Sequence, residues 1–481
     1  MGGLTLNFRR LIHEGFETGD MQARLLANWR QSNLSCASRI NPHFPLRACR
    51  VRFFYTAASR RRRQRPQTQL ALRQSATIKP PDPMGQLSAI AALLTSVFML
   101  IAGNSLVNTL IATRAKLEAF PQLALGLLAS AYFVGMLAGT LAAPALVRRA
   151  GFVRAFTASV AVAMVVTIAC PLVVFPSAWI LLRGVLGFAF AVLYGVIEAW
   201  VQSRATNKTR GGVYGFYQIV HFAGATVGQQ LIQIDFITSF TLFSVASILT
   251  ALAIIPLAMT RSEPPGTPRS VRLRIGWLIG VSPVGATTAL AVGSANGALW
   301  FLAPIFALGP TQSPQRVAAF MTAIVLGSAV GVLPIGRISD KSDRRLVIVA
   351  CAAIGAAVEI ALWLYATPPD LALVIFGFVL GFVTLPLYML AASQTNDRSG
   401  PEHVIEVSSG LLFLYCSGAI FSPYLASWLM GRFGDSTLFA QNATIHLALA
   451  AFTLWRMSIR APPPVATLRE DEATKPATGF P

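Results

Sequence analysis

Long uncharged, apolar runs recur along this chain, and they constrain its fold more than any other feature. The clearest runs are 83–113, 119–147, 155–182, 211–234, 236–260, 275–315, 371–396, 407–431 and 436–455. A helix needs about 20 apolar residues to cross the hydrocarbon core of a bilayer, so each run is long enough for one crossing. The runs lack the alternation over about ten residues that marks transmembrane β-strands. The pattern therefore predicts an all-α integral membrane protein with the lipid bilayer as its first partner.

The composition and the placement of charge agree with a membrane protein. Of 481 residues, 54% are hydrophobic and only 12% are charged, whereas a soluble domain carries about 25% charged residues. The net charge is +20, and residues 1–83 alone hold 15 Lys and Arg against 4 Asp and Glu. Most of the remaining excess falls in short loops, which follows the positive-inside rule. We therefore expect no nucleic acid partner.

Together with shorter uncharged stretches, the runs predict twelve transmembrane helices. Their expected bounds are 87–113, 122–147, 155–175, 178–202, 211–234, 236–259, 282–307, 317–336, 346–366, 371–395, 406–431 and 437–457. Loops on one side carry most of the Lys and Arg, including Arg148, Arg149, Arg344 and Arg345. That side, with both termini, is expected to be cytoplasmic.

The chain divides into five expected parts. The parts are an Arg-rich, disordered extension at 1–83, a six-helix half at 84–260, a cytoplasmic linker at 261–281, a second six-helix half at 282–460 and a disordered cytoplasmic tail at 461–481. Arg-rich, acid-poor sequence is also typical of a transit peptide. A start codon assigned too early is the other interpretation of the first part, with Met84 as the alternative start.

The two halves match as an internal repeat. A shift of 192 residues places Asn104 on Asn296, and it places a Gly-x-x-x-Gly pair of the second helix on one of the eighth. By the fourth helix the shift is 194, where VLGF at 185–188 meets VLGF at 379–382. The glycine pairs permit close helix packing. Ordered matches with one slip predict a six-plus-six parallel repeat, the arrangement of major facilitator transporters.

A dense charge cluster, GRISDKSDRR at 336–345, joins the eighth and ninth predicted helices. It resembles the major facilitator signature GxLADRxGRR, with Asp343 where the family has its second Gly and Ser339 in place of Ala. The first half has PALVRRAGFVR instead, which keeps a glycine but lacks the acid. The resemblance implies a cytoplasmic gating loop made by Gly336, Asp340, Lys341, Arg344 and Arg345, with Arg148, Arg149 and Gly151 in the first half. The alternative is that these charges only set the topology.

Further stretches resemble one subgroup of that superfamily, the YcaD-like transporters. They include SAYFVGMLAGTLAAPALVRRAGFVR, RGVLGFAFAVLYGVIEAW and VGQQL. The resemblance covers most of 84–460 and none of 1–83. It implies a multi-pass secondary transporter in a bacterial inner membrane, and we expect a monomer that handles a small-molecule solute.

Charged side chains inside predicted helices are candidates for coupling, because a charge in the bilayer usually faces a cavity or a partner. Arg183 opens an R-x-x-x-G pattern on the fourth helix, and Glu198 follows fifteen residues later. That separation is about 22 Å along the axis, on faces within roughly 60° of each other. Glu198 is the candidate proton carrier, and Arg183 modulates it or attracts an anionic group. An interfacial position is the alternative for Glu198, and for Glu359 a paired or interfacial role is preferred.

By analogy with the fold, helices one, four, seven and ten are expected to line a central cavity. Their polar candidates, with two from helix five, are Asn104, Asn108, Tyr194, Gln218, His221, Asn296, Trp300, Tyr388 and Gln394. A buried Asn or His more often bonds a neighbouring helix than a ligand. A purely structural role therefore remains an alternative for each.

The sequence lacks the motifs of the main alternative functions. It contains no GxxxxGKS or GxxxxGKT loop, no HExxH, no GxSxG and no CxxC pair. We therefore expect no enzyme, no cofactor and no metal site. The expectation is a proton-coupled secondary transporter, with export of an amphiphile slightly preferred over uptake of a small metabolite. A non-transporting membrane receptor or scaffold on the same fold is the alternative from another class.

Overall fold

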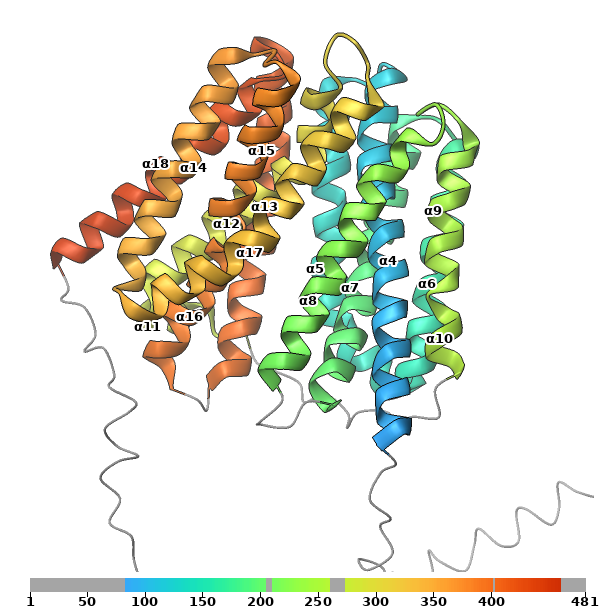
Figure 1. Ribbon diagram of the computed structural model, residues 1–481, viewed down its shortest axis with the longest axis horizontal. Coiled ribbons are helices and arrows are strands. Elements are labelled where there is room, and N and C mark those ends of the chain that lie inside the picture. The colour runs from blue at the N-terminus through green and yellow to red at the C-terminus, as the bar shows by residue number, and fades with distance from the viewer. Residues whose placement is uncertain (1–82, 205–209, 260–272, 401–402, 460–481) are drawn as a thin grey trace, which may run out of the picture. The chain divides into compact units, whose positions relative to one another are not determined.

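The computed structural model describes residues 83–204, 210–259, 273–400 and 403–459. These residues form helices joined by short turns, and no strand occurs among them (Figure 1). The extension predicted over 1–83 lies outside the described residues, apart from Pro83. The predicted tail 461–481 and much of the predicted linker 261–281 lie outside them as well.

The first half begins with a long helix and ends with two short ones. Its elements are α4 (Pro83–Leu117), α5 (Gln122–Ala150), α6 (Phe152–Leu172), α7 (Pro176–Arg204), α8 (Arg210–Gln230), the 3₁₀ turn η1 (Leu231–Gln233), α9 (Phe240–Leu252) and α10 (Ile254–Met259).

The second half repeats this plan after a short helix that occupies the end of the predicted linker. Its elements are α11 (Ile275–Val281), α12 (Pro283–Leu308), α13 (Pro314–Lys341), α14 (Arg344–Tyr365), α15 (Asp370–Thr384), α16 (Leu387–Ser399), α17 (Val404–Phe433) and α18 (Thr437–Ile459). The helix is interrupted at Pro386, between α15 and α16, because proline has no N–H to donate to the preceding turn.

Eleven helical segments in the described part are long and apolar enough to cross a membrane. They correspond to eleven of the twelve predicted spans, with α9 and α10 forming one segment and α15 and α16 another. The remaining predicted span is α8, which is helical but is not among the eleven. Its apolar character is diluted by polar side chains such as Gln218, His221, Gln229 and Gln230.

Equivalent glycines hold the second and fourth helices of each half together. A Cβ added to Gly135 of α5 would lie 1.8 Å from a backbone carbonyl oxygen of α7, and one added to Gly327 of α13 would lie 2.0 Å from a carbonyl oxygen of α15. Gly139 and Gly331 repeat this close approach one turn later. Any residue with a Cβ would overlap the neighbouring backbone here, so only glycine permits the two helices to pack this closely. The predicted repeat is therefore expressed as the same packing in both halves.

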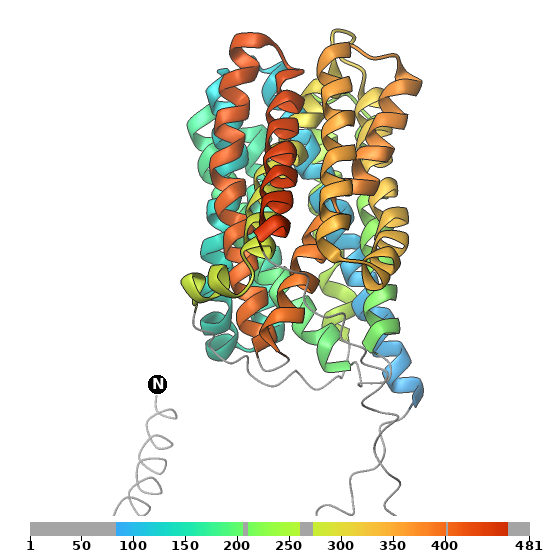
Figure 2. The same cartoon turned by 90° about the vertical axis from the view of Figure 1, so that its left-hand side faces the viewer.

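The two halves meet along α5 with α17 and along α8 with α13. In Figure 1 the first half runs from blue to green and the second from yellow to red. The turned view of Figure 2 shows the long helices running roughly side by side. We call the end of the bundle that carries Arg148, Arg149, Arg344 and Arg345 the basic end, and the opposite end the far end.

Polar contacts join the halves at the far end. Lys116 Nζ lies 3.1 Å from an Asp435 carboxylate oxygen. Gln230 Nε2 donates to Thr322 Oγ1 at 2.8 Å, and the Gly126 N–H donates to the Ser427 hydroxyl at 3.1 Å. Lys116 lies in the last turn of α4 and Asp435 just after α17, while the other groups lie in the first part of α5 and α13 and toward the end of α8 and α17. The contacts hold the halves together on that side of the cavity described next.

Candidate substrate cavity

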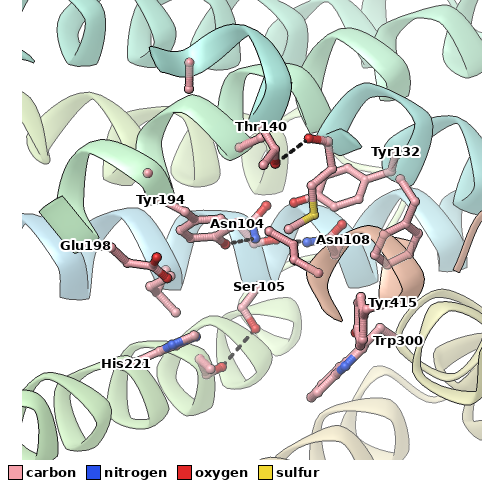
Figure 3. A pocket seen from close by; sticks show the side chains of 18 of the residues that line it. Asn104, Ser105, Asn108, Tyr132, Thr140, Tyr194, Glu198, His221, Trp300 and Tyr415 are labelled. Carbon is pink, nitrogen blue, oxygen red and sulfur yellow. Dashed lines mark hydrogen bonds between the residues drawn. The ribbon is translucent and has the colours of Figure 1, made fainter. Parts of the chain in front are cut away.

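A cavity of about 610 Å³ lies between the two halves within the described part of the chain. Its walls come from α4, α5, α7 and α8 of the first half, with Phe152 at the start of α6, and from α12 and α17 of the second. Figure 3 shows the side chains that point into it. Val147, Phe152 and Tyr217 extend the lining toward the basic end. A space of this size suits a small organic molecule.

Eight of the eleven predicted coupling and cavity residues line this space. They are Asn104, Asn108, Arg183, Tyr194, Glu198, Gln218, His221 and Trp300. The other three, Asn296, Tyr388 and Gln394, are not among the lining residues. Asn296 and Gln394 are buried inside the second half, and the Tyr388 ring packs edge-on against the Tyr415 ring at 5.5 Å. Lining a cavity does not establish a role, so the functions of all eleven stay predictions.

The cavity also contains polar residues that the sequence reasoning did not single out. They are Ser105, Tyr132, Thr140, Gln229 and Tyr415. Tyr132 and Thr140 lie eight residues apart on α5 with Met136 between them, and all three line the cavity. This i, i+4, i+8 spacing places them on one helix face. The spacing is visible in the sequence, but the family analogy had directed attention to other helices.

Hydrogen bonds join α8 to α4 along the cavity wall. Thr109 Oγ1 donates to Gln229 Oε1 at 2.7 Å, and Gln229 Nε2 donates to Ser105 Oγ at 2.9 Å. Ser105 Oγ in turn donates to the Ala225 carbonyl at 3.0 Å. The chain of bonds satisfies polar groups that would otherwise be buried without partners. It gives the α4–α8 wall a defined arrangement.

A second set of bonds joins α4 to α7. Asn104 Nδ2 donates to the Tyr194 hydroxyl at 2.9 Å, and Asn108 Nδ2 donates to the Asn104 carbonyl at 2.8 Å. Asn108 Oδ1 accepts from Arg183 Nη1 at 2.7 Å. Asn108 therefore orients the guanidinium of Arg183 within the cavity wall.

Arg183 is nearly fully buried, and aromatic rings surround it. Its side chain is 2% exposed. The guanidinium carbon lies 4.5 Å from the Tyr132 ring centre and 5.0 Å from the Phe301 ring centre. Phe301 belongs to the second half, so this cation–π contact reaches across the cavity between the halves. The cation is thus placed where a ligand between the halves would meet it.

Glu198 lies in the same cavity, with its side chain exposed to it. Figure 3 places Glu198 toward one end of the cavity and Tyr132 toward the other. Glu198 is the only carboxylate among the described lining residues. The two charges of the cavity are therefore held apart on one helix, α7.

The predicted gating residues lie at the basic end, in a shorter loop than expected. The helix α13 continues to Lys341, so Asp340 and Lys341 lie in its last turn, and only Ser342 and Asp343 separate it from α14. The loop predicted between 336 and 346 was therefore too long, because the charged residues extend the helix past the apolar run. Gly336 likewise lies within α13.

Arginine–carboxylate pairs organise this region of the second half. Arg344 contacts Asp340 at 2.9 Å and Asp397 at 2.6 Å, which ties α13 and α14 to α16. Arg345, 2% exposed, contacts Asp343 at 2.7 Å. Partial burial raises the pKa of Asp343, but hydrogen bonds from the Arg345 side chain and backbone outweigh it and leave the pKa below the usual value.

The corresponding turn of the first half is built differently. Gly151 alone separates α5 from α6, with a φ of 82° that favours glycine. In the second half, two residues with negative φ replace it, which accommodates Asp343 at the position of the family's glycine. Arg148 and Arg149 are exposed in the last turn of α5.

A buried pair lies elsewhere in the second half. His446 Nδ1 of α18 is 2.7 Å from Glu359 Oε2 of α14. The two side chains are 2% and 1% exposed. The pairing preferred for Glu359 is therefore found, although its partner was not predicted.

The comparisons with known proteins agree with this architecture. The sequence model of the Major Facilitator Superfamily matches residues 281–480. The MFS-type transporter YcaD of Escherichia fergusonii is 26% identical over 362 residues, which are 74% of this chain and 92% of the relative. An MFS-type transporter of Yersinia pestis is 26% identical over 377 residues, 78% of this chain and 96% of the relative. Over most of its length, this chain is similar to transporters of the major facilitator superfamily.

Solved structures share the fold of this chain. The nucleoside transporter NupG aligns with a TM-score of 0.65 at 13% identity, covering 77% of this chain and 100% of that one. The D-xylose–proton symporter aligns with a TM-score of 0.58 at 13% identity, covering 77% and 97%. The protein is a multi-pass membrane transporter of the secondary type.

Proposed function

We propose that this transporter moves a small organic solute across a bacterial inner membrane by alternating access, coupled to the movement of a proton. The observation that carries the proposal is the position of Glu198. It is a titratable carboxyl exposed in a cavity between two halves that can rock against each other. No cofactor takes part, and the chain acts as a monomer.

The contacts between the halves support the alternating-access part of the proposal. Lys116, Gln230 and Ser427 make polar contacts across the halves at the far end. The cavity lining reaches the other way, to Val147 and Phe152. With the basic end in the cytoplasm, as the positive-inside rule predicts, this conformation opens toward the cytoplasm. Transport then requires the far-end contacts to open and the basic end to close.

The charge of Glu198 supports the coupling part. Enclosing a carboxylate in apolar surroundings costs far more free energy than enclosing a neutral carboxyl. Closing the cavity at the basic end removes Glu198 from water. Proton binding to Glu198 therefore favours the closed and outward-open states, and proton release favours the present one.

An amphiphile is the proposed solute, because the cavity combines two charged side chains with aromatic surfaces, and export is the proposed direction. Tyr132, Phe133, Trp300, Phe301 and Tyr415 line it together with the polar groups. Such walls accommodate a molecule with one polar end and one apolar body. Uptake of a small metabolite is the alternative, and the same flux measurement distinguishes the two.

Purified protein in liposomes tests the proposal. Flux of a panel of amphiphiles and small metabolites is measured with a pH gradient of either sign and without one. Accumulation that needs the gradient supports proton coupling, and its dependence on the sign gives the direction. Flux that does not change with the pH gradient would show that transport is not coupled to protons. Binding without flux, in a preparation shown to be folded, would instead favour a receptor.

A further inference from the structure

We propose that the cavity binds the carboxylate of a small aromatic acid and that Arg183 is the counter-ion for that carboxylate. The proposal rests on the proposed function in that the acid is taken to be the transported solute. It names the chemical class of the substrate from the charge and shape of the site.

The first argument compares two buried arginines of this chain. Arg183 and Arg345 are both 2% exposed. Arg345 is neutralised by Asp343 at 2.7 Å. Arg183 has no Asp or Glu within ion-pair distance among the described residues, and its hydrogen bonds go to the Asn108 side chain and, at 3.4 Å, to the Leu128 carbonyl. One arginine is a completed structural pair, and the other lacks an anion.

The second argument is energetic. Removing a cation from water costs several kcal/mol, which neutral partners offset only in part. Asn108 and the rings of Tyr132 and Phe301 supply neutral partners. The carboxylate of Glu198 lies fifteen residues away on the same helix, about 22 Å along the axis, too far for an ion pair. The unfavourable charge is retained at the cavity wall, where an anionic ligand can neutralise it.

The third argument is the shape of the surroundings. The Tyr132 and Phe133 ring centres are 5.6 Å apart, and Phe133 and Tyr415 are 6.4 Å apart. Trp300 and Phe301 add aromatic surface from the second half. These ring pairs meet edge to face, at 89° and 64°, and aromatic surface of this kind next to one cation fits a planar ring that carries one carboxylate. The single unpaired cation in this part of the cavity fits one negative charge rather than two.

Thermal unfolding in detergent tests the charge argument without any ligand. The variants are Arg183→Met and, as the matched control, Arg345→Met. Methionine keeps an apolar stem and removes the charge. The Arg183 variant should unfold about 2 °C or more above the wild type, because it loses an uncompensated cation. The Arg345 variant should unfold below the wild type, because it leaves Asp343 without its partner.

Matched ligand pairs then test the chemical class with the same measurement. The probes are benzoate with benzamide, phenylacetate with phenylacetamide, and indole-3-acetate with indole-3-acetamide, all at millimolar concentration. The acid of at least one pair should raise the unfolding temperature of the wild type by about 2 °C or more, and its amide should not. Arg183→Met should lose that response, and Arg183→Lys should keep part of it because it retains the charge without the planar fork.

Three results would overturn the proposal. A fall in the unfolding temperature of Arg183→Met comparable to that of Arg345→Met would make Arg183 a structural residue. Equal rises in unfolding temperature with acid and amide, or no rise with any acid, would show that the cavity does not recognise a carboxylate. An acid response that survives in Arg183→Met would place the anion elsewhere. None of these measurements needs flux, so they separate this proposal from a failure of transport in liposomes.

Discussion

The first half of this transporter lines the cavity with polar and charged side chains, whereas the second half lines it with Gly297, Trp300, Phe301, Leu412 and Tyr415. The charges of the second half that form pairs lie away from the cavity. Arg344 and Arg345 pair with aspartates at the basic end, and Glu359 pairs with His446 inside the half. Two halves with one helix plan thus differ in where their polar groups lie. The residues proposed for recognition and coupling therefore lie in the first half, and the paired charges named here lie in the second.

The largest expected effect is on coupling, through Glu198. Glu198→Gln should reduce accumulation driven by a pH gradient by at least about tenfold, because an amide carries no exchangeable charge state, while exchange without a gradient remains. Liposome flux measures both. Glu118→Gln is the control, since Glu118 lies at the far end in a pair with Arg114.

A companion variant sharpens the comparison between the halves. Glu359→Gln in the second half should leave the response to the gradient intact in the protein that remains folded. Undiminished accumulation by Glu198→Gln, or its loss in Glu359→Gln, would move coupling to the second half.

The buried pair of the second half should give the largest effect on stability. His446→Leu leaves the Glu359 carboxyl buried without its partner, and it should cost about 2–4 kcal/mol. The double variant Glu359→Leu with His446→Leu should recover most of that loss, because neither polar group remains. Unfolding in detergent measures the three variants, and simply additive losses would contradict the pairing.

The glycine contacts test how closely the halves share their packing. Gly135→Ala and Gly327→Ala should each destabilise the protein by about 1–3 kcal/mol, because each Cβ would overlap a backbone oxygen of the neighbouring helix. Gly280→Ala on α11, where a Cβ meets nothing within 4 Å, is the matched control. Strongly unequal losses at the two repeat positions would mean that the halves pack differently.

The turn at the basic end should differ between the halves in its response to pH. The pKa of Asp343 is lowered in the folded state, so its contribution to stability is present above its unfolded pKa of about 3.9 and is lost as the pH falls through the folded pKa. Asp343→Asn should therefore lower the unfolding temperature modestly from pH 7 to 5, and the difference should shrink below about pH 4.

The first half supplies the control for that measurement. Arg149→Gln changes an exposed charge near the equivalent turn, and no described carboxylate forms an ion pair with Arg149. The difference in unfolding temperature between Arg149→Gln and the wild type should stay nearly constant between pH 3 and 7. Any change in it should be only a fraction of the change seen for Asp343→Asn. If the difference in unfolding temperature between Asp343→Asn and the wild type is as large at the lowest pH as at pH 7, the lowered pKa of Asp343 is contradicted.

The smallest expected effect is at the far end, where the halves meet. Lys116 and Asp435 are each about one-third exposed. Lys116→Ala should therefore cost less than about 1 kcal/mol, and the cost should disappear in about 1 M salt. A loss above about 2 kcal/mol that resists salt would show that this pair dominates the closure of the far end.

Several features were accessible from the sequence because they depend on pattern alone. Uncharged runs gave the spans, since the bilayer excludes unpaired charge wherever a helix crosses it. The spacing of Gly135 and Gly139, repeated at Gly327 and Gly331, predicted close packing in both halves. The loop at 336–345 was placed correctly but made too long, because an apolar run ends before the helix does.

Other features depended on contacts between distant parts of the chain. Asn296, Tyr388 and Gln394 lie on helices that the fold analogy assigned to the cavity, yet their side chains are held within the second half. Tyr132 and Tyr415 line the cavity from α5 and α17, which that analogy left out. Helix assignment alone does not give the rotation of each helix about its axis, which the packing of its neighbours sets.

The sequence by itself determined that this protein is a helical membrane protein with a repeated half, because apolar length, charge placement and glycine spacing are local properties of the chain. Only the tertiary structure decided that, among the residues it describes, Arg183 has no anionic partner while Arg345 has one, and that Glu359 lies against His446. The physical reason is that a charge in a low-dielectric interior is governed by what lies within a few ångströms of it. Those neighbours come from helices far apart in the sequence.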